Sequence, residues 1–163
     1  MRRLAGEDTQ FIFQETRVQH QHTMKIVVVD PEGGHGDLTY EGFREGIRMS
    51  IPHSEPFRWK LVKVPFRMGH PWWVDAPDLD IDYHVRRATA PGPGGKRELA
   101  EVISMIASIG LERDRPLWQA WLVDGLEGGR IALVMKVHHS LADGMSSAQL
   151  LLDLLDDTPD PRD

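Results

Sequence analysis

The stretch IALVMKVHHSLADG, residues 131–144, joins an apolar run to two neighbouring histidines, an aspartate and a glycine. Because side chains alternate along a β-strand, the odd-numbered residues from Ile131 to His139 share one face, and the even-numbered residues from Ala132 to His138 share the other. The two imidazoles then point to opposite faces and cannot readily hold one metal ion together. The stretch predicts a buried strand that ends at a histidine pair with two separate roles.

A second strand is expected directly before this one. Residues 117–123 are largely apolar, and the run DGLEGG that follows them is rich in turn-forming residues. A hairpin that joins residues 117–123 to residues 131–137 is the simplest arrangement. We expect the strand at 131–137 to be the more deeply buried of the two.

Three other segments are predicted as strands. Residues 24–29, MKIVVV, form a β-branched run closed by the turn-forming DPEGG, and they are expected to be a largely buried strand. Residues 58–64 alternate between the two faces of a strand, and Pro65 ends them. Residues 81–88 are also expected to be a strand.

Three segments show the apolar spacing of helices. Residues 39–51 have it, although two glycines weaken the pattern. A second helix is expected before Gly110, which stands where a C-terminal cap belongs. A third is expected over 145–155, after the histidine motif. The core-facing stripe of the second helix consists of Leu99, Val102, Ile103, Ile106 and Ile109.

Helices and strands are mixed along the chain, and no internal repeat is visible. This order predicts an α/β fold in which a mixed β-sheet is flanked by helices. A chain of 163 residues can bury one substantial core. We expect residues 1–157 to form one lobe and residues 158–163, where prolines lie among aspartates, to begin a linker.

Composition excludes several classes of protein. The chain contains no cysteine, so disulfides, thiolate metal sites and thiol nucleophiles are ruled out. Its net charge of -6 argues against a broad nucleic-acid surface. No apolar run approaches the roughly 18 residues that would span a bilayer. The first residues, MRRLAGED, lack the apolar stretch of an export signal, so we expect a cytoplasmic chain.

Two stretches each allow two interpretations. The segment 57–67 carries four cations among apolar residues, and it is either an exposed strand face, which we favour, or a surface for phosphate-bearing ligands or anionic lipid heads. Trp72 and Trp73 either dip into a lipid interface or, as we favour, pack between elements or against a further lobe that this sequence does not contain. The four cations of the first stretch are Arg58, Lys60, Lys63 and Arg67.

The histidine motif carries the chemistry that the sequence offers. A neutral imidazole near its usual pKa of about 6.5 can act as a general base, although adjacent histidines are more often packing or hydrogen-bonding residues. One histidine and Asp143 form a conceivable ligand pair, but no third metal ligand stands at a recognisable spacing. Asp143 either orients a ring nitrogen or, as we favour, caps the next helix and braces the turn. Gly144 fits a backbone conformation or a close approach that a side chain would obstruct.

The pattern of two histidines, three residues, aspartate and glycine is shared by acyltransferases of the CoA-dependent, chloramphenicol-acetyltransferase-like fold, including the condensation domains of peptide synthetases. The flanking residues resemble, more narrowly, the bacterial wax ester synthase/diacylglycerol acyltransferase family. The segments that carry this narrower resemblance are LAGED at 4–8, GHPWWVD at 69–75, DIDYHVRR at 80–87, PLW at 116–118, LEGGR at 126–130 and KVHH at 136–139.

The resemblance implies a chloramphenicol-acetyltransferase-like N-terminal lobe, the first half of a two-lobed enzyme with a tunnel between the lobes. In that family an acyl group passes from the co-substrate acyl-CoA to diacylglycerol or a long-chain alcohol, with no further cofactor and no metal. The second histidine of the motif is the base, which maps to His139, while His138, Asp143 and Gly144 map to supporting positions. A further family block, thought to shape the structure or the acyl pocket, maps to Pro116, Leu117 and Trp118.

The family has a second lobe with an Asn-Asp motif, which this sequence lacks. We therefore expect little activity from this chain alone, a C-terminal lobe as its partner and peripheral contact with a membrane or lipid droplet. Two other functions are left open. One is a condensation-type, amide-forming acyltransferase that uses the same histidine. The other is a non-catalytic lipid-binding or regulatory lobe that keeps the motif as a structural relic.

Overall fold

A computed structural model describes residues 2–4, 6–16, 18–30, 38–62 and 71–141. Short 3₁₀ turns occur at Ile51–His53, Glu55–Arg58 and Glu127–Gly129. The helices are α1 (Gly6–Gln14), α2 (Tyr40–Ser50), α3 (Ile81–His84) and α4 (Lys96–Ser108). The strands are β1 (Arg2–Arg3), β2 (His22–Val29), β3 (Trp59–Val62), β4 (Trp72–Asp75), β5 (Val85–Thr89), β6 (Trp118–Asp124) and β7 (Ile131–His138).

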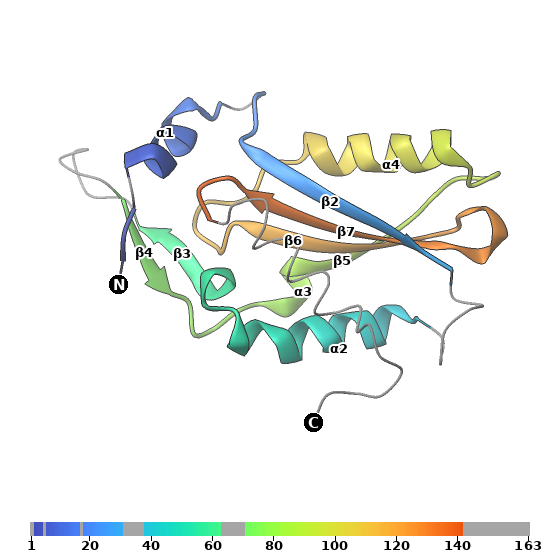
Figure 1. Cartoon of the computed structure of the whole chain (residues 1–163), viewed down its shortest axis with the longest axis horizontal. Coiled ribbons are helices and arrows are strands. Elements are labelled where there is room, and N and C mark those ends of the chain that lie inside the picture. The colour runs from blue at the N-terminus through green and yellow to red at the C-terminus, as the bar shows by residue number, and fades with distance from the viewer. Residues whose placement is uncertain (1, 5, 17, 31–37, 63–70, 142–163) are drawn as a thin grey trace.

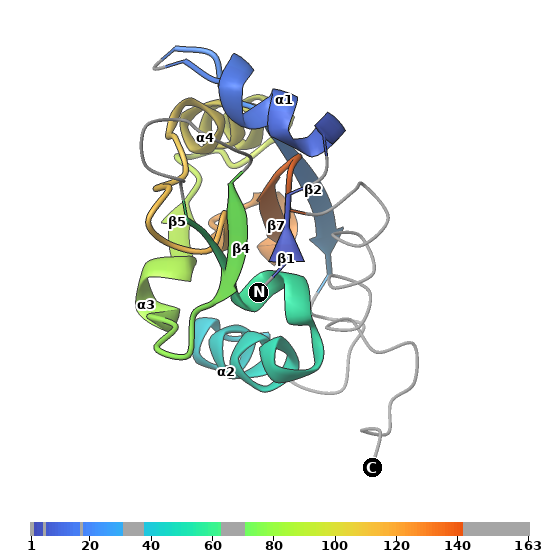
Figure 2. The same ribbon diagram turned by 90° about the vertical axis from the view of Figure 1, so that its left-hand side faces the viewer.

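The larger sheet lies between two helical layers (Figure 1). Its strand order is β2-β7-β6-β5, in which only the β5–β6 pair is parallel. Helix α4 lies along one face, and α2 lies on the other side, as the view turned by 90° also shows (Figure 2). A smaller sheet of order β1-β4-β3 stands beyond the end of β7. The predicted α/β class, a mixed sheet flanked by helices, is confirmed.

The predicted hairpin is confirmed as β6 and β7. The two strands pair antiparallel, with Trp118 opposite Val137 and Val123 opposite Ala132. The connecting turn needs a glycine at Gly125, because its φ is +76° and a Cβ there would lie 2.8 Å from the carbonyl oxygen of Ala90. Both strands are buried along nearly their whole length, so the expected difference in burial is wrong; both occupy the middle of the sheet.

The alternation predicted for residues 131–139 divides the core into two clusters. Leu133, Met135 and Val137 pack into the cluster beneath α2 and the small sheet. Ala132 and Val134 pack into the second cluster, with Val102 and Ile106 of α4. The sheet therefore has two apolar faces, and the histidine pair stands where both faces end.

Strand β2 differs from the prediction of a largely buried strand. It lies at the edge of the described sheet and pairs with β7. Ile26 and Val28 point to the face that carries α4, yet they stay 43% and 45% exposed. The β-branched run therefore identified the strand correctly, but it does not distinguish an edge position from a central one.

Residues 81–88 are not one strand, as predicted. They form the single helical turn α3 and then β5. Asp80 caps this turn, since its side chain accepts a hydrogen bond from the backbone N–H of Tyr83 at 3.3 Å. Because the chain forms a helical turn after Asp80, strand pairing begins only at Val85, which the sequence pattern alone did not reveal.

The predicted glycine cap of α4 is wrong. The helix ends at Ser108, and Ile109 follows in an extended conformation and is 37% exposed, so its predicted place in the core-facing stripe is wrong. The carbonyl groups of Ile106 and Ile109 instead accept hydrogen bonds from the buried ammonium of Lys136 on β7. Gly110 allows a close approach, because a Cβ there would lie 3.1 Å from the His20 ring.

The small sheet separates the two neighbouring tryptophans. Leu61 and Trp73 face each other on the inner side, and Trp73 is only 4% exposed. Val62 and Trp72 face each other on the outer side, where Trp72 is 38% exposed. The packing interpretation is therefore confirmed for Trp73 alone.

Several predicted features lie outside the described residues. These are the turn after Asp30, the end of the strand predicted at 58–64, the cations Lys63 and Arg67, the helix predicted at 145–155 and the linker at 158–163.

Candidate active site

The histidine pair is held at the end of β7 by its two neighbouring strands. The backbone N–H of His138 donates to the carbonyl oxygen of Leu117, directly before β6, over 2.9 Å. The backbone N–H of His139 donates to the carbonyl oxygen of Gln21, just before β2, also over 2.9 Å. The backbone at both histidines is therefore fixed from both sides.

His138 is a buried and neutral ring. Its side chain is 1% exposed. Its Nδ1 accepts the backbone N–H of Ser140 at 3.1 Å and lies 2.7 Å from the Ser140 hydroxyl, which donates to it. Burial lowers the pKa of His138 to about 4, against the opposing effect of the Glu15 carboxylate. These contacts give His138 a structural role in the motif.

His139 is placed differently. It is half-buried, and its ring stacks on Phe11 of α1, with the centroids 5.0 Å apart and an interplanar angle of 20°. Within the described part of the chain, neither ring nitrogen of His139 has a hydrogen-bond partner. A general base needs one ring nitrogen that is free to accept a proton, and no described residue occupies either nitrogen of this ring. Asp143 and Gly144, the other predicted supporting residues, lie outside the described residues.

The predicted block of Pro116, Leu117 and Trp118 lies in the core, directly behind the histidines. All three residues are buried. The indole of Trp118 donates to the carbonyl oxygen of Phe57 at 2.7 Å and stacks on the ring of His84 at 4.3 Å. Together with the hydrogen bond from His138 to Leu117, these contacts support the structural part of the prediction.

His84, which the sequence analysis did not single out, packs behind this block. Its Nδ1 lies 2.8 Å from the Trp118 carbonyl oxygen, which can only accept, so Nδ1 carries the proton. Burial lowers the pKa of His84 to about 4. His84 is the last residue of α3, and no spacing in the sequence connects it with Trp118.

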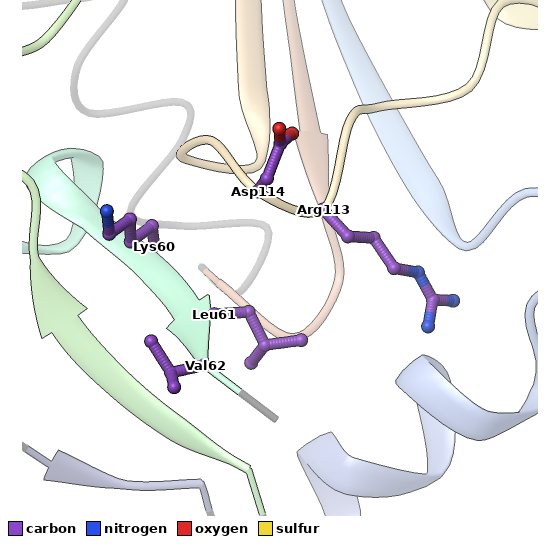
Figure 3. Close-up of a pocket in the computed structure, with 5 residues that line it drawn as sticks. All are labelled: Lys60, Leu61, Val62, Arg113 and Asp114. Carbon is purple, nitrogen blue, oxygen red and sulfur yellow. The ribbon is translucent and has the colours of Figure 1, made fainter. Parts of the chain in front are cut away.

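An open cavity of about 440 Å³ lies between β3 and the segment before β6. Lys60, Leu61, Val62, Arg113 and Asp114 line it (Figure 3). Leu61 extends toward the turn that follows β7 and belongs to the same apolar cluster as Leu141 in that turn. The cavity therefore adjoins the segment that carries the histidines.

Sequence reasoning also missed Glu15 and Arg113. The Glu15 carboxylate lies 3.7 Å from Nε2 of His138 and forms an ion pair with Arg113 at 2.6 Å. These two residues lie 98 positions apart, and their spacing carries no recognisable signal. Only the packing of α1 against the segment before β6 brings them together.

Metal-binding clusters and membrane-spanning helices are both absent from the described residues. Among them, no three side chains of histidine, cysteine, aspartate or glutamate are arranged to bind a metal ion. None of the described helices is long and apolar enough to cross a bilayer.

Comparison with known proteins gives consistent matches. The model of the wax ester synthase/diacylglycerol acyltransferase catalytic domain matches residues 4–163. One relative is a protein of Mycobacterium tuberculosis that is named "Putative diacyglycerol O-acyltransferase". It is 40% identical over 161 residues, which cover 99% of this chain and 34% of that protein. The solved structure of a wax ester synthase/diacylglycerol acyltransferase from Marinobacter aquaeolei matches all of this chain and 39% of its own, with a TM-score of 0.82 and 33% identity.

A more distant match concerns the fold alone. The first condensation domain of the calcium-dependent antibiotic synthetase matches 94% of this chain and 36% of its own, with a TM-score of 0.74 and 21% identity. This likeness confirms the chloramphenicol-acetyltransferase-like fold implied by the motif. The chain spans just over a third of the length of each of these three proteins.

Proposed function

This chain belongs to the wax ester synthase/diacylglycerol acyltransferase family, and from that premise we propose that it supplies the general base, His139, of an acyl-CoA-dependent O-acyltransferase. The acyl donor is a fatty acyl-CoA. The acceptor is the hydroxyl of diacylglycerol, which gives triacylglycerol, or of a long-chain alcohol, which gives a wax ester. No cofactor and no metal ion takes part in this proposal.

The observation that carries the proposal is the difference between the two rings. His138 is buried with its Nδ1 engaged, whereas His139 is half-buried with neither nitrogen bonded to a described residue. A hydroxyl is a weak nucleophile, and a positioned base contributes typically about 10²–10⁴-fold to the rate. This difference supports the second ring as the one that accepts a proton from an incoming alcohol.

The reaction follows from this placement. The neutral ring of His139 accepts the hydroxyl proton as the alcohol oxygen attacks the thioester carbonyl carbon. The tetrahedral centre collapses, the C–S bond breaks, and the proton passes from His139 to the leaving CoA sulfur. Ester and free CoA are the products, no covalent enzyme intermediate forms, and the ring ends neutral.

The remaining motif residues have supporting roles in this proposal. His138 anchors the strand end, Asp143 braces the turn, and Gly144 allows the backbone to pass closely. Pro116, Leu117 and Trp118 shape the wall behind the motif and, from there, the acyl pocket. Their burial supports a shaping role and argues against direct contact with the reacting atoms.

A second lobe completes the enzyme in this proposal. The chain matches only 34% and 39% of the lengths of its relatives, so the tunnel for both substrates is shared with a C-terminal lobe. We expect this chain alone to form little or no ester.

Reassembly with a C-terminal lobe tests the base. The chain, mixed with that lobe, is expected to form labelled ester from acyl-CoA and diacylglycerol or a fatty alcohol. His139→Ala should lower turnover about 10²–10⁴-fold with the fold intact. His53→Ala, at an exposed histidine, is the matched control and should be fully active.

Each alternative function has its own outcome. Unchanged turnover by His139→Ala would assign the ring a structural role and favour a non-catalytic lobe. Preference for an amine over an alcohol acceptor would favour a condensation-type enzyme. Robust ester formation by this chain without the second lobe would contradict the shared tunnel.

Peripheral lipid contact of a cytoplasmic protein is also part of the proposal. The exposed pair of Trp72 and Val62 on the outer side of the small sheet supports it. Flotation with phospholipid vesicles should be weakened in Trp72→Ser, whereas Phe13→Ser, at another exposed aromatic residue, should float like the wild type. Equal flotation of Trp72→Ser and the wild type would remove this surface from the proposal. Trp73 is unsuitable for this test because it lies in the core.

A further inference from the structure

The buried acid Glu15 lies directly after α1 and faces the histidine motif. Its side chain is 8% exposed. One carboxylate oxygen, Oε2, accepts two hydrogen bonds from Arg113, at 2.6 Å and 3.2 Å. Burial alone would raise the pKa of Glu15, but the hydrogen bonds from Arg113 and from the Gln21 N–H hold it below its usual value. The carboxylate is therefore ionised.

Arg113 fixes this carboxylate in place. Figure 3 shows its side chain directed away from Lys60 and toward α1. The same guanidinium nitrogen that binds Glu15 also donates to the carbonyl oxygen of Ile12 at 2.8 Å. One cation thus joins the end of α1 to the segment before β6, and it leaves Glu15 little freedom to move.

Glu15 faces the second ring nitrogen of His138, Nε2. The backbone N–H of Ser140 can only donate, so Nδ1 of His138 accepts, and the proton of the neutral ring is on Nε2. That nitrogen is buried with no hydrogen-bond partner among the described residues, and it lies 3.7 Å from Oε2 of Glu15. The negative charge faces the polar N–H and stabilises this tautomer.

Glu15 is also connected to the second histidine. Its Oε1 accepts the backbone N–H of Gln21 at 3.4 Å. The carbonyl oxygen of the same residue, Gln21, accepts the backbone N–H of His139 at 2.9 Å. One carboxylate therefore contacts the ring of His138 and the residue that fixes the backbone of His139.

We propose that Glu15 is a positioning residue of the active site, which, held by Arg113, orients His138 and the strand end from which His139 acts. The catalytic part of this inference rests on the proposed function, and the contact with His138 does not. Glu15 touches no reacting atom. It acts through the two histidines, and Arg113 acts through Glu15.

The first test separates positioning from binding. In the reassembled enzyme, Glu15→Gln should lower kcat about ten- to hundredfold and leave KM for acyl-CoA within about threefold, because small misplacement of a base costs rate. Arg113→Lys keeps the charge and should retain more of kcat than Arg113→Gln. Glu45→Gln, at an exposed acid on α2, is the matched control. Wild-type kcat in Glu15→Gln would overturn the proposal.

The second test does not depend on activity. Imidazole ¹⁵N resonances of the 163-residue chain should show His138 with Nε2 protonated. Glu15→Gln should shift the His138 ring signals and leave those of the exposed His53 unchanged. Unchanged His138 signals would overturn the contact even if activity falls. If His139→Ala proves fully active, the proposed base is wrong, and these resonances alone decide whether Glu15 orients His138.

Replacing Glu15 leaves the Arg113 charge unpaired in a partly buried site, which can prevent folding. The double variant Glu15→Gln, Arg113→Gln removes both charges and is expected to fold. It should show the same shift of the His138 signals and the same loss of kcat. Wild-type signals and kcat in the double variant would contradict the proposal.

Discussion

The ring of His139 lies against the ring of Phe11, with centroids 5.0 Å apart and planes inclined by 20°. Phe11 belongs to α1, so a helix from the start of the chain limits where the imidazole at the end of β7 can point. The stack covers one face of the ring and leaves its edge, which carries the nitrogens, without a partner among the described residues.

Removing this stack should reduce turnover more than stability. Phe11→Ala frees the His139 ring to sample other rotamers, and we expect kcat to fall about tenfold because the base is less well oriented. Phe13→Ala, on the same helix but 61% exposed, is the control and should leave kcat unchanged. Ester formation by the reassembled enzyme is the measurement, and equal kcat values for the two variants would show that the stack does not orient the base.

Acid should destabilise the fold through two buried histidines. His84 and His138 have pKa values of about 4 in the folded protein, because burial disfavours their charged forms. In the unfolded chain they bind protons below about pH 6.5. Between these values the unfolded state binds more protons, so the free energy of unfolding falls as the pH drops, by about 1.4 kcal/mol per pH unit for each ring.

Urea unfolding between pH 7 and pH 5 measures this dependence. A His84→Phe variant should show a shallower slope than the wild type, because one of the two rings no longer titrates. A free energy of unfolding that stays constant over this range would contradict the neutral, buried state of both rings.

Trp118 should be important for stability. Trp118→Phe removes the hydrogen bond from the indole to the Phe57 carbonyl at 2.7 Å and leaves a gap beside His84. We expect a loss of about 2–4 kcal/mol in the free energy of unfolding, from the unpaired carbonyl and the lost packing. Trp72→Phe, at the exposed neighbour of Val62, should change it by less than about 0.5 kcal/mol. Urea denaturation compares the two, and similar losses would be unexpected.

Two glycines of the β6–β7 turn separate backbone strain from steric clash. Gly125 and Gly129 have φ values of +76° and +70°, but only at Gly125 would a Cβ meet another atom, the Ala90 carbonyl oxygen at 2.8 Å. Gly129→Ala should cost about 1 kcal/mol, for the left-handed conformation alone. Gly125→Ala should cost more, because the turn must also move. Thermal unfolding of both variants provides the comparison, and equal changes in Tm would contradict the clash.

Local patterns predicted the elements whose surroundings are regular. Alternation assigned the two faces of residues 131–139 correctly, since both faces of β7 meet an apolar layer. The turn-rich run before Ile131 predicted the hairpin correctly, because the two strands on either side of it pair directly. The helices α2 and α4 were found from spacing, although the end of α4 was not.

The failures come from contacts between distant parts of the chain. A lysine from β7 caps α4, where the sequence suggested Gly110. The edge position of β2 depends on the order of strands in space, which its β-branched residues do not encode. Glu15 and Arg113 could not be predicted as a pair, because their contact exists only after α1 has packed.

The side chains of residues 138 and 139 point to opposite faces of the strand, so substitutions at these two adjacent positions should have different effects. Substitutions of His138 should affect mainly folding and stability, because that ring is buried. Substitutions of His139 should affect mainly turnover, because that ring is half-buried and its edge has no partner among the described residues. A library that randomises both codons should therefore yield folded but inactive proteins with changes at 139 and insoluble proteins with changes at 138. Stability and turnover can then be engineered in separate rounds.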